Sequence, residues 1–145
     1  ADKSNKHGFC LGWANESWKR KQWSKDGLGD VTLIEQLYPG REDDKAHFFS
    51  FLDAFMDDRY MRIDEKPIFL LYKPFAHPYL KDFISYWNEL AKNNGINNGF
   101  CFIGKLSSDY NQQSISYLKS VGFDYVTCER CNMGEAPFLK KIYYD

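Results

Sequence analysis

Glutamate and tryptophan side chains in the first third of the chain have the residue types that sugar chemistry requires. The segment Trp13-Ala-Asn-Glu-Ser-Trp18 places Glu16 between two indoles and directly after Asn15. Apolar surroundings raise the pKa of a carboxyl group toward the range of a general acid, and flat indole faces stack on pyranose rings. The segment therefore predicts a carbohydrate site, with Glu16 as its acid, base or nucleophile, Asn15 as a hydroxyl partner, and Trp13 and Trp18 as sugar platforms.

Further candidates for this site follow along the chain. Trp23 extends the aromatic set, and Glu35 lies in the apolar stretch Thr-Leu-Ile-Glu-Gln-Leu-Tyr, where it is a candidate for the second carboxylate of two-carboxylate glycosyl chemistry. Tyr72 and Lys73 end the apolar run of residues 68–72, and a cation there can hold a phosphate or carboxylate. The sequence thus predicts Glu16 and Glu35 as catalytic residues, with the remaining side chains as substrate-binding residues.

Each of these residues also has a purely structural interpretation. The tryptophans can close the end of a sheet, while Glu16 caps a helix or forms an ion pair. Glu35 can lie on the wet face of an edge strand, and Lys73 can simply be solvated. Cys128-Glu-Arg-Cys131 is a single Cys-x-x-Cys pair without the two further ligands that zinc requires. We therefore expect no metal site.

Hydrophobic periodicity divides most of the chain into alternating strands and helices. Continuous apolar runs predict buried strands, and apolar residues at helical spacing predict amphipathic helices. The expected strands are residues 7–15, 68–72, 99–106 and 123–129, and the expected helices lie within residues 41–60, 77–95 and 111–122. Residues 16–39 are expected to form a long functional loop, Asp43 or Asp44 to cap the first helix, and "MRIDEKP" to form a turn.

This alternation predicts the α/β class, with a parallel sheet in sequence order and three covering helices. Four strands make either a small open α/β domain or part of an eight-stranded (β/α) barrel of the TIM type, which typically needs about 250 residues. At 145 residues we expect one domain over residues 1–145. Either fold places its site at the carboxyl ends of the strands.

Composition excludes several classes of function. The formal net charge is −1, so nothing marks a surface for nucleic acid, and the longest apolar runs fall short of the roughly 20 residues of a membrane span. No glycine-rich nucleotide loop is present, and we expect no cofactor. Four scattered cysteines favour a reducing cytoplasm. The first residue is Ala1, and the start of the chain is expected to be cut. The oligomeric state is left open.

Several ordered blocks resemble the WbsX-type glycosyltransferase family, whose members are similar to glycoside hydrolase family 99 enzymes. The family blocks are Trp-Ala-Asn-Glu-x-Trp, Ile-Glu-Gln-x-Tyr, Asp-x-Arg-Tyr, Ile-Asp-x-Lys-Pro and Tyr-Arg-Pro, and here they fall at residues 13–18, 34–38, 57–60, 63–67 and 72–74. The last block has Lys73 where the family has arginine, which removes a bidentate fork.

The resemblance implies a carbohydrate-active bacterial protein of O-antigen, capsule or lipopolysaccharide biosynthesis, acting on a carbohydrate or sugar-nucleotide substrate. It also implies that this chain corresponds to the central portion of a (β/α) barrel, without an amino-terminal segment and a carboxyl-terminal Trp-Asn-Glu-Trp block. A glycosyl site needs two opposed catalytic groups, so we expect the chain alone to bind sugar weakly and not to turn it over. The alternatives are a non-catalytic carbohydrate-binding module and a structural α/β domain.

Overall fold

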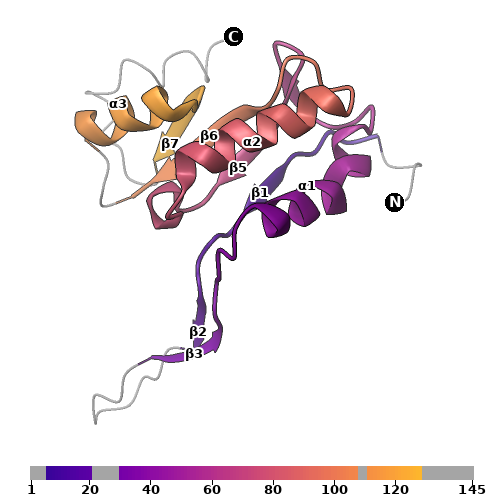
Figure 1. The fold of residues 1–145 in the computed structure, drawn as a ribbon. Coiled ribbons are helices and arrows are strands. Elements are labelled where there is room, and N and C mark those ends of the chain that lie inside the picture. The colour runs from indigo at the N-terminus through magenta and orange to yellow at the C-terminus, as the bar shows by residue number, and fades with distance from the viewer. Residues whose placement is uncertain (1–5, 21–29, 108–110, 129–145) are drawn as a thin grey trace.

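Four parallel strands lie side by side in the order in which they occur along the chain (Figure 1). The computed structural model describes residues 6–20, 30–107 and 111–128. The strands are β1 (Leu11–Trp13), β5 (Lys66–Leu71), β6 (Cys101–Leu106) and β7 (Tyr125–Cys128). Their registers pair Leu11 with Phe69, Ile68 with Cys101, and Ile103 with Tyr125. The predicted parallel sheet in sequence order is confirmed.

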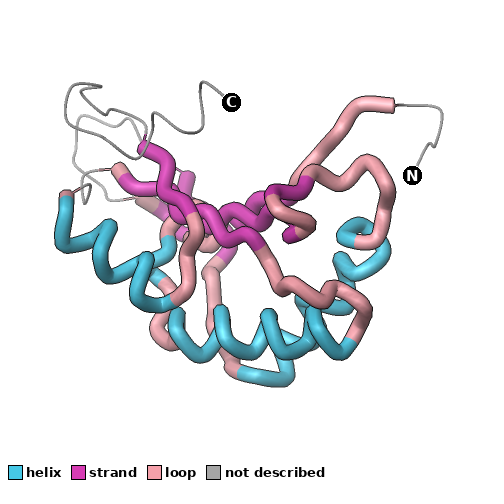
Figure 2. The backbone as a smooth tube through the Cα atoms, turned by 90° about the horizontal axis from the view of Figure 1, so that it is seen from above, coloured by secondary structure: helices cyan, strands magenta, loops and turns pink. Residues whose placement is uncertain are grey.

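The three helices lie on one face of this sheet, as Figure 2 shows. They are α1 (Arg41–Phe55), α2 (Leu80–Asn93) and α3 (Gln112–Val121). The α/β class and the three predicted helices are therefore confirmed. Among the described residues the strands form an open sheet, so membership of an eight-stranded barrel stays a prediction. None of the described helices combines the length and the apolar character needed to cross a membrane.

Aromatic rings fill the core between the helices and the sheet. Trp87 of α2 is fully buried at its centre, and its indole Nε1 donates a hydrogen bond to the backbone carbonyl of Asp44, at 3.0 Å. Its ring lies 4.7 Å from that of Phe69 on β5 and 5.8 Å from that of Phe48 on α1, measured between centroids. The indole thus contacts both α1 and the sheet, and its one polar atom, Nε1, is hydrogen-bonded.

A buried tyrosine fixes β1 against β5. The Tyr60 hydroxyl donates to the carbonyl of Ile68 at 2.6 Å and accepts from the backbone N–H of Leu11 at 3.0 Å. Burial raises the pKa of Tyr60 to about 12, so the hydroxyl keeps its proton across the physiological range. Because β1 has only three residues, it forms few backbone hydrogen bonds with β5. The Tyr60 hydroxyl adds a side-chain link between the two strands and so helps to hold β1, and the residues after it, in place.

One local prediction was wrong, and a second was incomplete. Helix α1 begins at Arg41 after Gly40, whose φ of 110° only glycine adopts readily, so neither Asp43 nor Asp44 is the cap. Both aspartates lie in the first helical turn, where negative charge suits the helix dipole. The stretch "MRIDEKP" is more than a turn, because β4 (Arg62–Ile63) pairs antiparallel with β5.

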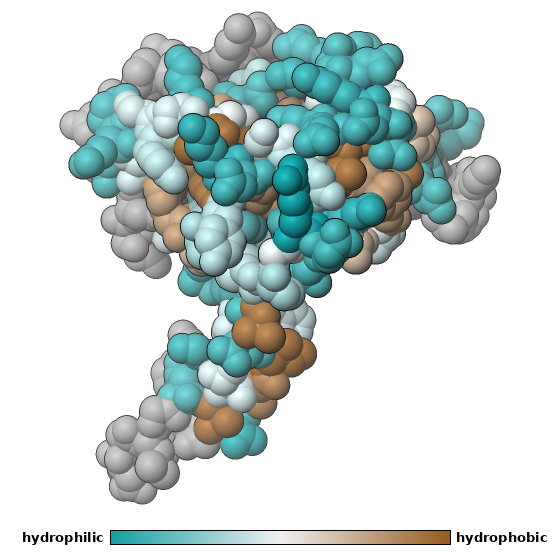
Figure 3. Space-filling model, viewed as in Figure 1, coloured by the Kyte–Doolittle hydropathy of each residue, from teal (hydrophilic) through white to brown (hydrophobic). Residues whose placement is uncertain are grey.

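Part of the expected long loop is a β-hairpin that extends away from the sheet (Figure 1). Its strands are β2 (Trp18–Arg20) and β3 (Val31–Ile34), paired antiparallel. Apolar side chains gather on this extension, where Figure 3 shows a brown patch. They include Trp18, Leu33 and Ile34, each about 60% exposed. The hairpin projects directly from the segment that carries Glu16.

Candidate functional site

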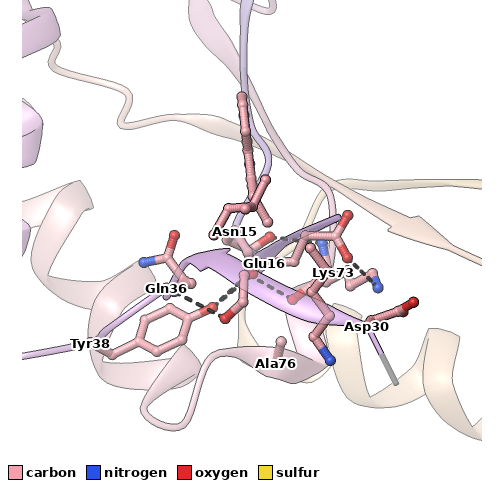
Figure 4. Close-up of a pocket in the computed structure, with 11 residues that line it drawn as sticks. Asn15, Glu16, Asp30, Gln36, Tyr38, Lys73 and Ala76 are labelled. Carbon is pink, nitrogen blue, oxygen red and sulfur yellow. Dashed lines mark hydrogen bonds and ion pairs between the residues drawn. The ribbon is translucent and has the colours of Figure 1, made fainter. Parts of the chain in front are cut away.

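A cavity of about 910 Å³ lies where β1 and β5 end. Its walls come from the residues after β1, from the β2–β3 hairpin, and from the segment after β5 that leads into the short 3₁₀ helix η1 (Pro74–Ala76). Figure 4 shows the polar side chains that line it, with Glu16 and Lys73 close together. The site therefore lies at the carboxyl ends of parallel strands, where α/β folds carry their functional residues.

Asn15 is the structural centre of the cavity wall, and its side chain is fully buried. Its Oδ1 accepts from the backbone N–H of Lys73 at 2.7 Å, while its Nδ2 donates to the Lys73 carbonyl at 2.7 Å. The same Nδ2 donates to the Tyr38 hydroxyl at 3.2 Å, and that hydroxyl donates to the Asn15 carbonyl at 2.9 Å. Asn15 thus joins the ends of β1 and β5 to the chain after β3. Predicted as a hydroxyl partner for sugar, it uses its amide within the protein.

Glu16 and Lys73 form an ion pair inside the cavity. The Lys73 Nζ lies 2.5 Å from the Glu16 Oε2, with the lysine side chain half exposed and the glutamate side chain 36% exposed. The hydrogen bond that the Lys73 ammonium donates to Glu16 raises the pKa of Lys73. A neighbouring ammonium stabilises the charged form of a carboxylate. Glu16 is therefore placed beside a cation rather than among indoles alone, an arrangement that suits a base or nucleophile better than an acid.

The two tryptophans of the motif occupy different environments. Trp18 lines the cavity and is 61% exposed, so its face is available to a ligand. Trp13 packs into the core, with its ring centroid 4.7 Å from that of His47 and 5.5 Å from that of Phe83. Among the described residues that line the cavity, Trp13 is absent. The structure therefore offers Trp18 as a platform and uses Trp13 to support the wall behind it.

Two other predicted site residues, Glu35 and Tyr72, are not among the described residues that line the cavity. Glu35 follows β3 with an exposed side chain and is not among the described lining residues. The Tyr72 ring is covered by the Lys105 ammonium, 3.6 Å from the ring centroid. Trp23 lies outside the residues that the structure describes, as does Cys131. No cluster of three possible metal-binding side chains occurs within residues 6–20, 30–107 and 111–128.

Several lining residues were not predicted from the sequence, and three of them are Asp30, Gln36 and Tyr38. Asp30 contributes a second carboxylate, and Gln36 lies on the wall with its backbone N–H donating to the Ser17 hydroxyl at 3.0 Å. Tyr38 holds Asn15, although 23 residues separate the two. Tyr38 ends the family block at residues 34–38, so the motif could have identified it as a site residue. It was not chosen because only the carboxylate of that block, Glu35, was considered.

Comparison with known proteins shows which family the sequence of this chain matches. The profile of the family described as glycosyltransferase WbsX matches residues 1–140. The chain belongs to the WbsX glycosyltransferase family. Two proteins named "Uncharacterized protein WxcX", from two strains of Xanthomonas campestris pv. campestris, are each 35% identical to it over 97 residues. The aligned segment covers 66% of this chain and 13% of each relative, so the WbsX chain spans a small part of their length. No solved structure matches.

The Asn15 network should matter for the stability of this WbsX chain. Replacing Asn15 by Ala removes two hydrogen bonds to the Lys73 backbone and one to the Tyr38 hydroxyl, and each such bond contributes about 0.5–1.5 kcal/mol. We expect Asn15→Ala to lower the free energy of unfolding by at least about 2 kcal/mol in urea titrations. Asn93→Ala, at an exposed position of α2, is the matched control and should change it by less than about 0.5 kcal/mol. Equal effects of the two variants would contradict the structural role of Asn15.

A buried histidine packs behind the cavity wall. His77 is 5% exposed, its Nδ1 accepts from the backbone N–H of Tyr79 at 3.2 Å, and its Nε2 has no partner among the described residues. Its ring lies 4.6 Å from that of Tyr38, measured between centroids. Burial lowers the pKa of His77 to about 4, so the ring is neutral at pH 7.

This histidine predicts a loss of stability in acid. The unfolded chain binds the proton at a pKa near 6.5 and the folded chain only near 4, so stability falls as the pH drops from about 6.5 toward 4. We expect the His77 contribution to the free energy of unfolding to fall by about 2 kcal/mol between pH 7 and pH 5. Burial also lowers the pKa of His47, so the full chain should lose more.

Urea titrations at both pH values, on the unchanged chain and on His77→Gln, measure the His77 share. The difference between pH 7 and pH 5 should shrink by about 2 kcal/mol in the variant. A direct NMR titration of His77 giving a pKa near 6.5 would show that the ring is not held neutral by burial.

Proposed function

We propose that this chain forms part of the glycosyl-transfer site of an enzyme of bacterial polysaccharide biosynthesis, with Glu16 as its base or nucleophile. The observation that carries the proposal is the Glu16–Lys73 pair, which lies in the cavity at the strand ends beside the exposed indole of Trp18. Membership of the WbsX family supports transfer of a sugar unit. The assembled product is an O-antigen, a capsule or a lipopolysaccharide.

Each cavity residue has a distinct part in this reaction. The Trp18 face stacks on the apolar side of a pyranose ring, which orients the anomeric carbon. Lys73 pairs with the Glu16 carboxylate, and Asn15 fixes the Lys73 backbone. As a base, the Glu16 carboxylate takes the proton of an acceptor hydroxyl while that oxygen bonds to the anomeric carbon and the bond to the leaving group breaks. As a nucleophile, Glu16 itself bonds to the anomeric carbon while the bond to the leaving group breaks. In a second step the acceptor oxygen bonds to that carbon, the bond to Glu16 breaks, and the second carboxylate takes the proton of the acceptor hydroxyl.

Both routes require a second group opposite Glu16. Asp30 lines the same cavity and comes directly before β3. Glu35 comes directly after β3. Carboxyl separations of about 5–5.5 Å accompany retention and about 6.5–9.5 Å accompany inversion. We expect the 145-residue chain to bind sugars weakly and to show no turnover until flanking sequence closes the site.

Sugar binding at Trp18 tests the proposal directly. Methyl glycosides of glucose, galactose, mannose, rhamnose and N-acetylglucosamine should shift the indole N–H signal of Trp18 in ¹H–¹⁵N NMR spectra, with dissociation constants in the millimolar range. The signal of buried Trp87 is the internal control and should not move. The same titration of Trp18→Ala, followed at the backbone amide signals of Asn15 and Lys73, should show weaker binding. If no glycoside moves the Trp18 signal at 100-fold excess or more, the proposed sugar site is wrong.

A further inference from the structure

A second cavity, of about 390 Å³, lies between η1 and the first turns of α3. The rings of Phe75 and Tyr117 form one side of it, stacked with centroids 5.8 Å apart and planes inclined by 27°. Phe75 is 43% exposed and Tyr117 is 46% exposed. Two adjacent aromatic rings with nearly half their surface in water present a continuous apolar face that the fold itself does not use.

Polar groups without partners surround these rings. Gln113 and Ser114 line the cavity, and no hydrogen bond engages their side chains or the Tyr117 hydroxyl within the part of the chain that the structure describes. His77 lines it as well, 95% buried and with an Nε2 that lacks a partner. An apolar ring face combined with an amide and hydroxyl groups is the chemistry that binds a sugar, because a pyranose has one apolar side and a rim of hydroxyls.

The two cavities differ in the charge of the side chains that line them. The first contains Lys19 and Lys73 together with Asp30 and Glu16, whereas the described lining of the second has no charged side chain, since His77 is neutral at pH 7. An anionic ligand such as a sugar diphosphate finds no cation among the described residues that line the second cavity. Its ligand should therefore be a neutral sugar.

The position of the second cavity connects it to the first. Helix η1 lies between them, because Ala76 lines the first cavity and its neighbour Phe75 lines the second. The His77 ring, on the wall of the second cavity, packs against Tyr38, which lines the first. Both cavities follow the carboxyl end of β5, so one extended ligand can occupy both.

We propose that the Phe75–Tyr117 cavity is a subsite for a neutral sugar unit of the acceptor oligosaccharide whose neighbouring unit occupies the Glu16 cavity. This inference rests on the proposed function and adds the class of ligand that the same site takes. An acceptor of several units gains affinity from this subsite, whereas a single sugar in the first cavity does not.

Affinity as a function of oligosaccharide length tests the subsite. The probes are α-linked oligomers of glucose, mannose and rhamnose with one to four units, titrated into the ¹⁵N-labelled 145-residue chain. We expect the affinity to rise about 5- to 10-fold from one unit to three, with shifts at the amides of Phe75, Gln113 and Tyr117 only for the longer probes. Phe75→Ala and Tyr117→Ala should each remove this gain.

The matched control is Phe49→Ala on α1, since Phe49 is 44% exposed and lines neither cavity among the described residues. Phe49→Ala should keep the gain with length. If single sugars bind at Trp18 and length adds nothing, the subsite is overturned while the proposed function stands. If binding depends on Phe75 and Tyr117 but not on Trp18, the proposed function fails and the aromatic cavity is the sugar site. If no probe shifts any of these signals, both the subsite and the proposed function fail.

Discussion

Glycosyl transfer is expected to fall by about 10²–10⁴-fold when Glu16 is replaced by Gln, because the amide neither accepts a proton at neutral pH nor attacks an anomeric carbon. The substitution keeps the shape of the side chain and a hydrogen bond to Lys73. The pair is partly exposed, so its loss should change the free energy of unfolding by less than about 1 kcal/mol. Transfer from nucleotide-sugar donors and hydrolysis of α-linked oligosaccharides are the assays, in the shortest form of the protein that shows turnover.

Glu89→Gln is the matched control for this experiment. Glu89 lies on α2 in an exposed ion pair with Arg41, and neither residue is among the described cavity lining, so its replacement should leave transfer unchanged. Glu35→Gln and Asp30→Asn, made beside it, identify the second carboxylate. Full activity in Glu16→Gln together with loss in Glu35→Gln would move the central role to Glu35. Turnover by the 145-residue chain alone would refute the expectation that it is inactive without flanking sequence.

Trp87→Ala should lower the stability of the chain, whereas Trp18→Ala should weaken sugar binding and leave stability unchanged. Trp87 is fully buried among aromatic rings, and truncating a buried tryptophan costs about 3–5 kcal/mol, so Trp87→Ala should unfold most of the chain or leave it marginally stable. Trp18 is 61% exposed, and its removal should change the free energy of unfolding by less than about 1 kcal/mol. Weaker sugar binding with unchanged stability is expected for Trp18→Ala.

Circular dichroism melts and urea titrations measure the stability of both variants, and the glycoside titration measures binding. Trp87→Phe keeps most of the apolar volume but loses the hydrogen bond to Asp44, so it should lie between the unchanged chain and Trp87→Ala. A Trp18→Ala variant as unstable as Trp87→Ala would mean that the hairpin indole serves the core. Its sugar binding would then no longer report on the cavity.

Elements whose apolar pattern reflects burial were predicted well. Helix α2 buries Leu80, Phe83 and Trp87 at helical spacing, and β5 and β6 are continuous apolar runs, so local pattern and tertiary burial agree. The β2–β3 hairpin was not predicted because its apolar side chains are exposed, and exposure removes the alternation by which a strand is recognised. Helix α1 begins three to four residues earlier than expected, because its N-cap is Gly40 rather than Asp43 or Asp44.

The candidate site was predicted in its residue types but only partly in its geometry. The end of β1 and the end of β5 were both named, and the structure brings Glu16 and Lys73 into contact there. The sequence does not show which of Trp13 and Trp18 is exposed to a ligand. Both are indoles, and only the tertiary packing places Trp13 against the core and leaves Trp18 exposed. Tyr38 reaches Asn15 through a tertiary contact that no spacing rule encodes.

Strand order also determines when the site can assemble during folding. Neighbouring strands β6 and β7 are joined by contacts only 22 residues apart, such as that between Phe102 and Asp124, whereas Asn15 meets Lys73 across 58 residues. Closing the longer loop costs roughly 1 kcal/mol more entropy, so we expect β5, β6 and β7 to associate first and β1 to dock last. Pulsed hydrogen exchange should protect Phe102 before Trp13; the reverse order would contradict this sequence of events. The cavity that holds Glu16 then exists only after the final docking step, and a chain caught earlier has a sheet but no site.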